Sequence, residues 1–238
     1  LIYNAMIHPI EDFRISGMLW YQGESNAERA YEYNQSFPLL INSWRQKFGE
    51  NLPFYFVQLA TFNTKGDSNE GCDWCEVRDA QLNTTKMKNT GMVVTTDVGN
   101  PNDIHPRNKK TVGERLANLA LNNGLKSPIY QKSTVKGNKI TISFNTKEKL
   151  VSKNNEILKG FEIAGNDQKF YPAKAEIKKN KIVVTSEKVS NPVAVRYGWK
   201  GDDSEINLFT EKGLPIAPFR TDSFKLSTEN KKYQFELK

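Results

Sequence analysis

The sequence predicts an α/β protein in two parts: a layered domain with a parallel sheet over residues 1–124, and a small antiparallel β module over residues 125–238. In the first part, short apolar runs alternate with segments of helical composition, which is typical of parallel strands joined by helices. After Gly124 the pattern changes to short stretches separated by Gly and Asn turns, which indicates antiparallel strands. With 238 residues, 37% of them hydrophobic, the chain can bury the core of one large domain or of two small ones.

The first part contains three apolar runs that end in polar turns, and each is expected to form a buried strand. These runs are residues 15–21, 52–59 and 92–96. Three helices are expected at residues 27–47, 74–87 and 111–121, the last with an apolar face. Pro38 is expected to break or restart the first helix, and Gly49 stands where that helix should end.

The second part contains four stretches that read as strands, several of them with an alternation that fits half-buried strands. They are residues 133–144, 160–171, 175–184 and 192–199, with turns such as Lys136-Gly137-Asn138 and Lys179-Asn180. No internal repeat or low-complexity linker interrupts either part.

The chain is basic, with a net charge of +7 and a pI near 9.2. Its lysines are scattered rather than clustered among stacking aromatic residues, so no nucleic acid is expected as a partner. An acidic sugar would suit this sign of charge. No apolar run approaches the roughly 18 residues that span a bilayer, so no membrane partner is expected either.

The two cysteines, Cys72 and Cys75, form a Cys-x-x-Cys pair. Such a pair can be a redox site, half of a zinc site or a small local disulfide. A four-cysteine zinc site is excluded because no second pair exists. A mixed site is not expected, since His8 and His105 are the only histidines. A loop disulfide or two free thiols are favoured, and no metal is expected.

The turn after the first predicted strand is the first candidate for chemistry, with the sequence Gln22-Gly23-Glu24-Ser25-Asn26. Ligands of open parallel sheets bind beyond the carboxyl ends of the strands, where this turn lies. A glycine there lets backbone N–H groups approach a ligand, and an asparagine can donate to a developing oxyanion. The same residues would equally serve as the capped start of a helix, with Ser25 or Asn26 as the cap.

The second candidate is Asp103-Ile104-His105-Pro106, in the polar loop after the third predicted strand. A histidine in such a loop can act as general base to a serine while a carboxylate holds its tautomer. An ordinary surface histidine is the alternative for His105. His8, which is followed directly by Pro9, is expected to be structural.

Together these segments resemble the SGNH hydrolases. Residues 20–27 resemble the third SGNH sequence block, in which a Gly and an Asn line the oxyanion hole, here Gly23 and Asn26. Residues 103–107 resemble the last block, which supplies the catalytic histidine, here His105. More narrowly, residues 3–9, 192–199 and 207–222 are similar to segments of the sialate O-acetylesterases.

The resemblance implies an SGNH or flavodoxin-like three-layer fold, present in part, and a serine carbohydrate O-acetylesterase that needs no cofactor. Acetylated sialic acids or related acetylated sugars would be the substrates. Gln22 and Glu24 would shape the pocket or bind sugar hydroxyls. An extracytoplasmic location, whether periplasmic, secreted or lysosomal, is favoured by the resemblance.

Two departures from the family pattern matter. The nucleophilic serine of the family lies in a Gly-Gln-Ser-Asn-Met-like segment that this sequence lacks, so a missing N-terminal segment is expected to supply it. The commoner pattern has an Asp three residues before the histidine, where this chain has Asn102. Asp103 is therefore expected to orient His105, with a backbone carbonyl as the alternative.

Two other readings stay open. Gly23-Glu24-Ser25-Asn26-Ala27 approximates the Gly-x-Ser-x-Gly elbow of an α/β-hydrolase-type esterase, in which Ser25 would act with His105 and either Asp97 or Asp103. Alternatively, the chain is a non-catalytic carbohydrate-binding or structural fragment.

Overall fold

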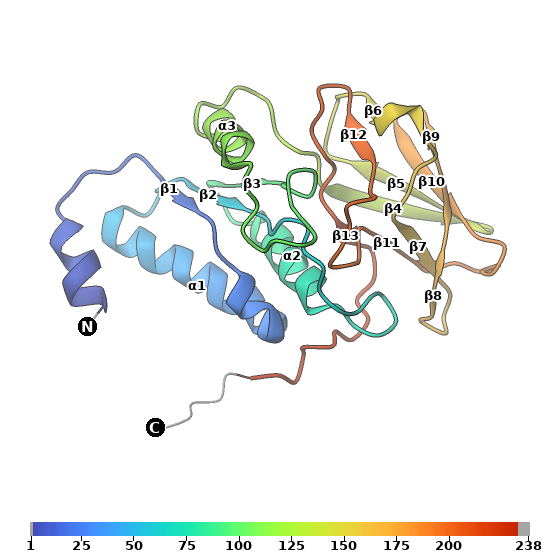
Figure 1. Ribbon diagram of the computed structural model, residues 1–238, viewed down its shortest axis with the longest axis horizontal. Helices are drawn as coiled ribbons and strands as arrows, with labels where there is room; N and C mark the ends of the chain where they lie inside the picture. The colour runs from blue at the N-terminus through green and yellow to red at the C-terminus, as the bar shows by residue number, and fades with distance from the viewer. Residues whose placement is uncertain (1, 233–238) are drawn as a thin grey trace.

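A computed structural model describes residues 2–232 and confirms a mixed α/β protein with one parallel sheet and several antiparallel sheets (Figure 1). The chain starts with two short helical turns, Tyr3–Ile7 and His8–Ile10. The parallel sheet has the strand order β1-β2-β3, with β1 at Met18–Trp20, β2 at Phe54–Val57 and β3 at Thr90–Val93. All three strands lie inside or overlap the runs that the sequence predicts.

Helices cover both faces of this sheet. Phe54 and Phe56 of β2 point into a core shared with α1 (Ala30–Phe48) and α2 (Asp73–Thr84). Val57 of β2 and Val93 of β3 contact Val112 and Leu116 of α3 (Lys109–Ala120) on the opposite face. Figure 1 shows α3 on one side of the sheet and α1 and α2 on the other. The apolar run of β2, the central strand, is therefore nearly continuous because both of its sides are covered.

The first helix differs from the prediction at Pro38. A 3-10 turn at Glu24–Arg29 precedes α1, which then runs unbroken through Pro38 to Phe48, with Gly49 as its C-cap. Proline in a helix interior removes one backbone hydrogen bond and is unfavourable by about 3 kcal/mol. Tyr33, Phe37 and Ile41 are buried along one face of α1. Burying three such side chains is favourable by roughly 1.5–3 kcal/mol each, which is enough to keep the helix whole.

The second half consists of antiparallel sheets. The larger exposed sheet has the order β4-β5-β10-β9, with strands Tyr130–Lys136, Lys139–Phe144, Lys181–Thr185 and Lys174–Lys178. A second sheet has the order β13-β11-β7-β8, with strands Phe219–Arg220, Ala194–Tyr197, Phe161–Ala164 and Phe170–Pro172. β12 (Leu208–Thr210) pairs with β6 (Leu150–Ser152). The predicted stretches contain most of these strands, but β6, β12 and β13 were not predicted.

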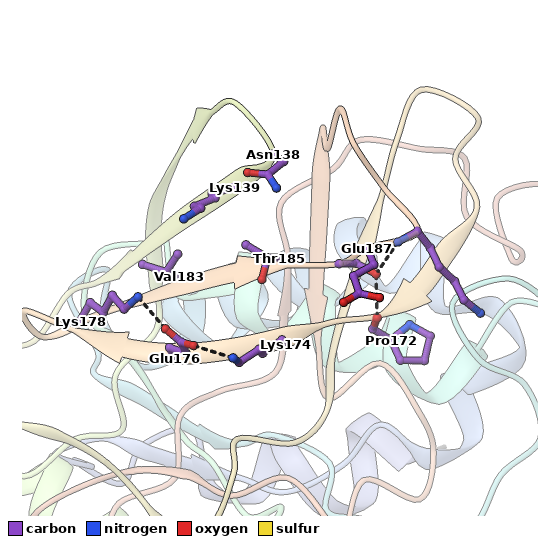
Figure 2. A pocket seen from close by; sticks show the side chains of 11 residues that line it. Asn138, Lys139, Pro172, Lys174, Glu176, Lys178, Val183, Thr185 and Glu187 are labelled. Carbon is purple, nitrogen blue, oxygen red and sulfur yellow. Dashed lines mark hydrogen bonds and ion pairs between the residues drawn. The ribbon is translucent and has the colours of Figure 1, made fainter.

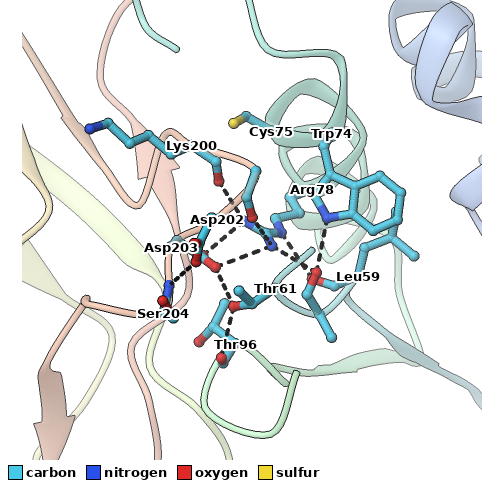
Figure 3. A network of polar contacts seen from close by, with 12 residues as sticks. Leu59, Thr61, Trp74, Cys75, Arg78, Thr96, Lys200, Asp202, Asp203 and Ser204 are labelled. Atoms are coloured by element: carbon cyan, nitrogen blue, oxygen red, sulfur yellow. Dashed lines mark hydrogen bonds and ion pairs between the residues drawn. The ribbon is translucent and has the colours of Figure 1, made fainter. Parts of the chain in front are cut away.

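Buried polar contacts join the two halves (Figure 3). The guanidinium of Arg78 on α2 donates to Asp203, with Nη1 2.8 Å from Oδ2, and both side chains are 1% exposed. Arg78 also donates to the carbonyls of Leu59 and Ala60, at the carboxyl end of β2. The single hydroxyl proton of Thr61 lies between two acceptors, the carboxylate of Asp203 and the carbonyl of Thr96. The loop around Asp203 is thereby fixed to the segments that follow β2 and β3.

The end of the described chain also returns to the first half. The carboxylate of Glu76 on α2 accepts hydrogen bonds from the backbone N–H and the hydroxyl of both Ser227 and Thr228. Three apolar residues of the second half, Trp199, Ala217 and Leu226, belong to the core of the first. Contacts therefore cross the expected boundary at residues 124/125, and the division into two domains stays a prediction.

Cys72 and Cys75 form a disulfide at the start of α2, so the local disulfide among the predicted alternatives is confirmed. The sulfur of Cys72 also accepts from the N–H of Cys75, which caps the helix. None of the helices in residues 2–232 combines the length and apolarity required to cross a membrane.

Candidate active site

The turn after β1 depends on a glycine. Gly23 has φ 153° and ψ −19°, a conformation that favours glycine over residues with a side chain. A β-carbon there would stand 3.1 Å from Nε2 of Gln81 and 3.2 Å from a methyl group of Val77. The N–H of Gly23 makes no hydrogen bond within residues 2–232, whereas its carbonyl accepts from the N–H of Asn26. The turn therefore holds one backbone donor free at the end of the strand.

Asn26 is held by a chain of side-chain hydrogen bonds. The hydroxyl of Tyr33 donates to Oε1 of Gln22 at 3.0 Å, and Nε2 of Gln22 donates to Oδ1 of Asn26 at 2.6 Å. This order fixes the Asn26 amide with its oxygen toward Gln22. Its Nδ2 makes no hydrogen bond in the described part of the chain, so the turn carries a second free donor three residues after Gly23. Two such donors are the components of an oxyanion hole.

His105 lies in the loop between β3 and α3, and its side chain is exposed. The Asp103 carboxylate accepts from the backbone N–H of His105 at 2.9 Å, so it holds the loop rather than the ring. The imidazole makes no hydrogen bond to any of residues 2–232. The role of Asp103 as the orienting partner of the imidazole therefore stays a prediction.

The two segments leave the same edge of the sheet. Trp20 pairs with Phe56, and Phe56 pairs with Met92, so the ends of β1 and β3 are level with one another. They stand two strand spacings apart, about 10 Å. Nζ of Lys109, at the start of α3, lies 4.8 Å from the ring centre of Tyr21. The turn and the histidine loop therefore follow strand ends on the same side of the sheet, and the joining of Gly23, Asn26 and His105 in one site stays a prediction.

The remaining candidate residues have distinct surroundings. Glu24 is half-buried; burial raises the pKa of Tyr21, and the Glu24 carboxylate adds to that shift. The Ser25 side chain is exposed, and its hydroxyl bonds to no group in residues 2–232, His105 included. Both carboxylate oxygens of Asp97 accept from Arg115, at 2.7 and 2.6 Å. The structure does not join Ser25, Asp97 and His105 into a hydrogen-bonded triad.

Two residues that the sequence did not single out support the turn. Tyr33 orients Gln22, and Nε2 of Gln81 donates to the backbone carbonyl of Gln22 at 3.2 Å. Oε1 of Gln81 accepts from the N–H of Leu59 at 2.9 Å, which ties the turn to the end of β2. Tyr33 lies four residues before Phe37 on the buried face of α1, so its spacing is that of an ordinary core residue.

No group of three or more His, Cys, Asp or Glu side chains in the described residues is arranged to hold a metal ion. The arrangement at this edge of the sheet is instead two free hydrogen-bond donors and an exposed imidazole. Such a set can stabilise a negatively charged oxygen and move a proton, which are the requirements of acyl transfer.

The chain is similar to known carbohydrate esterases. The model of the family described as "Carbohydrate esterase, sialic acid-specific acetylesterase" matches residues 1–122. The sialate O-acetylesterase of Mus musculus is 39% identical over 133 residues, which covers 49% of this chain and 25% of that protein. The human sialate O-acetylesterase is 37% identical over 133 residues, with 49% and 25% covered.

A solved structure is similar over most of the chain. The crystal structure of a carbohydrate acetylesterase from Xanthomonas citri superposes with a TM-score of 0.89 at 40% sequence identity. The match covers 94% of this chain and 54% of that one. The chain thus spans about half of the solved relative and about a quarter of the curated relatives.

Proposed function

The chain belongs to the sialic acid-specific acetylesterase family of carbohydrate esterases, and from this premise we propose that it is part of a serine O-acetylesterase of the SGNH type. Its substrates would be O-acetylated sialic acids or related acetylated sugars, with Gln22 and Glu24 shaping the pocket or binding sugar hydroxyls. The disulfide between Cys72 and Cys75 supports a location outside the cytoplasm, because such bonds persist in oxidising compartments.

The observation that carries the proposal is the pair of free donors at the turn after β1. The N–H of Gly23 and Nδ2 of Asn26 would donate to the acetyl oxygen as it becomes negative. The hydrogen bonds from Tyr33 through Gln22 hold the Asn26 amide in place before substrate arrives. A donor that needs no reorganisation contributes about 10²–10³ in kcat.

His105 would move the proton. A serine Oγ attacks the acetyl carbon as His105 takes the hydroxyl proton, which gives a tetrahedral oxyanion. The bond between the acetyl carbon and the sugar oxygen then breaks, and His105 gives its proton to that oxygen, which leaves as a sugar hydroxyl. Water attacks the acetyl-serine in the same way, acetate leaves, and the serine regains its proton. Asp103, which holds the backbone of His105, would position the loop or, after a side-chain rotation, the ring.

We place the nucleophilic serine on polypeptide outside these 238 residues. β1 is an edge strand of its sheet within the described residues, and Leu19 in its centre is 57% exposed. Phe13, shortly before β1, is 69% exposed. An unpaired edge with exposed apolar residues is unusual for a parallel sheet, whose strands are normally covered. A further strand paired in parallel with β1 would end at the same edge of the sheet as the turn and could bring a serine there.

The test is acetate release by the full-length protein from O-acetylated N-acetylneuraminic acid and from p-nitrophenyl acetate. His105→Ala is expected to lower kcat by about 10⁴ or more, and Asn26→Ala by about 10²–10³. Lys88→Gln changes an exposed side chain just before β3, at the opposite edge of the sheet, and should leave the rate unchanged. Wild-type rates in the His105 variant would refute the proposal.

Ser25→Ala separates the proposal from the α/β-hydrolase alternative. The Ser25 hydroxyl has no bond to His105 in this structure, so near-parent activity is expected in that variant. Loss of activity with retained fold would make Ser25 the nucleophile. If the full-length protein releases no acetate from any of these substrates yet binds them, a non-catalytic carbohydrate-binding role is supported instead.

A further inference from the structure

The outward face of the sheet β4-β5-β10-β9 is unusually rich in lysine. The inward side chains, such as Ile140, Ile142, Ile182 and Val184, are fully buried in the core of the second half. Because strand residues alternate between faces, the residues between them point outward. Six of these outward residues are lysines, and we call them the lysine face: Lys132, Lys136, Lys139, Lys174, Lys178 and Lys181.

The lysines lie on both sides of a central row of four paired residues, three of them with short side chains. Thr134 of β4 pairs with Thr141 of β5, Thr141 pairs with Val183 of β10, and Val183 pairs with Glu176 of β9. The lysines lie two residues to either side of this row along their strands. At about 3.3 Å per residue, the two lines of ammonium groups are therefore anchored roughly 13 Å apart. The side chains in the centre of the face are mostly short, and the lysines make its two borders positively charged.

This arrangement works against the stability of the sheet. Lys136 stands directly opposite Lys139, and Lys181 directly opposite Lys178. Like charges at directly paired positions destabilise a sheet. Lysines on edge strands can protect against aggregation, but Lys139 and Lys181 belong to the two central strands. Neither protection against edge-to-edge aggregation nor core packing explains why these lysines are paired, Lys136 with Lys139 and Lys181 with Lys178.

Only part of this charge is neutralised. Glu176 contacts Lys174 at 3.0 Å and Lys178 at 2.6 Å, and these bonds lower the pKa of Glu176 to about 2. Lys136, Lys139 and Lys181 make no ion pair with any residue of the described chain. Residues 125–238 hold 22 Lys and Arg against 13 Asp and Glu, whereas residues 1–124 hold 12 against 14. The positive charge of the protein therefore belongs to this half.

The face is also hollowed. Lys139, Lys174, Lys178 and Thr185 line a hollow of about 630 Å³, together with residues of the loop 186–188. Figure 2 shows Lys174, Glu176 and Lys178 in a line along one strand, with Asn138 and Lys139 on the hairpin opposite. Glu187 lies at the other end. Such a space has room for sugar units between the lines of lysines.

We propose that the lysine face binds an acidic polysaccharide, a chain of sugars that carry carboxylates. The ammonium groups would pair with carboxylates along the chain, and the threonine hydroxyls between them would bond sugar hydroxyls. A nucleic acid fits less well, because the face has no aromatic side chain for base stacking and no arginine for bidentate phosphate contacts. The surface is separate from the candidate active site, since β9 and β10 lie at the opposite end of the molecule from β1 (Figure 1).

The test is binding of polygalacturonate to the full-length protein, measured by isothermal titration at 20 and 150 mM salt. Dextran serves as the neutral polymer and a short DNA duplex as the competing polyanion. The variant is Lys136→Gln/Lys139→Gln/Lys181→Gln, which leaves the ion pairs of Glu176 in place. The matched control is Lys65→Gln/Lys88→Gln/Lys126→Gln, which removes the same charge from exposed lysines elsewhere.

The face variant should bind polygalacturonate about tenfold more weakly, with a smaller salt dependence, while the control stays within about twofold of wild type. Its melting temperature should be unchanged or higher, because opposed charges are removed. Equal loss in both variants would reduce the effect to net charge and overturn the proposal. The proposal would also be overturned if the protein bound the DNA duplex more tightly than polygalacturonate, or bound dextran as tightly as polygalacturonate. Acetate release plays no part in this readout, so its outcome is independent of the esterase proposal.

Discussion

Removing the carboxylate of Asp203 should strongly destabilise the protein. Arg78 and Asp203 are each 1% exposed, and their charged groups meet at 2.8 Å where the two halves join (Figure 3). Asp203→Ala would leave the guanidinium buried without its counter-charge. Breaking a buried pair from one side lowers the free energy of unfolding by about 3–5 kcal/mol. In a chain of this length each 1 kcal/mol moves Tm by about 2–4 °C, so Tm should fall by about 6–20 °C.

The assay is urea unfolding at pH 7 followed by tryptophan fluorescence. Asp202→Ala is the matched control, because it removes the same charge one residue away at an exposed position. Its effect should stay below about 1 kcal/mol. The Arg78→Met/Asp203→Leu double variant should lose less than the sum of its single variants. It should not recover fully, since the carbonyls of Leu59 and Ala60 lose their donor.

A loss below about 1 kcal/mol in Asp203→Ala, equal to that of the Asp202 control, would refute this account of the interface. The account would also be refuted if the stability losses of the two single variants added up to that of the double variant, because two charges in direct contact must show coupling.

Tyr33→Phe removes the hydroxyl that donates to Gln22, so kcat for acetyl esters should fall about tenfold with KM unchanged, and an unaltered kcat would contradict the role of this bond. Reducing the disulfide between Cys72 and Cys75 should lower the free energy of unfolding by about 2 kcal/mol and Tm by about 4–8 °C. Thermal melts with and without reductant measure this, and a variant with both cysteines replaced by serine should not respond. Burial raises the pKa of Glu162 above its ordinary 4.5, so the folded state keeps a proton that the unfolded chain has lost. Stability then falls as pH rises from about 4.5 through the folded-state pKa. Glu162→Gln should therefore gain stability relative to the parent at pH 7 but not at pH 4, and equal differences in urea titrations at both values would count against it.

The parts of the fold that follow from local sequence were predictable. The run Phe54-Tyr55-Phe56-Val57 predicts a strand because its residues are buried on both sides, as the structure shows. β13, by contrast, has only two residues, and its pairing with β11 depends on a partner more than 20 positions away. No local pattern marks such a strand.

The candidate site shows the same division. The rule that parallel strands end at one edge leads us to expect Gly23 and Asn26 on the same side of the sheet as His105, and their grouping into one site stays a prediction. The bonds that orient Asn26 were not predictable, because Tyr33 has the helical spacing of a core residue and its hydroxyl could have bonded elsewhere. Likewise, one Cys-x-x-Cys pattern is compatible with thiols or a disulfide, and only the spatial position of the two sulfurs decides between them.

The hydrogen bonds between Glu76 and the segment at Ser227 and Thr228 also affect folding during translation. These partners are 151 and 152 positions apart, and Glu76 is 1% exposed. At about 5–20 residues per second, translation reaches Ser227 roughly 8–30 s after Glu76. During that interval α2 carries a carboxylate without its donors, and the apolar sites for Trp199 and Leu226 are open. The buried contacts of α2 therefore cannot be completed before Thr228 has emerged from the ribosome.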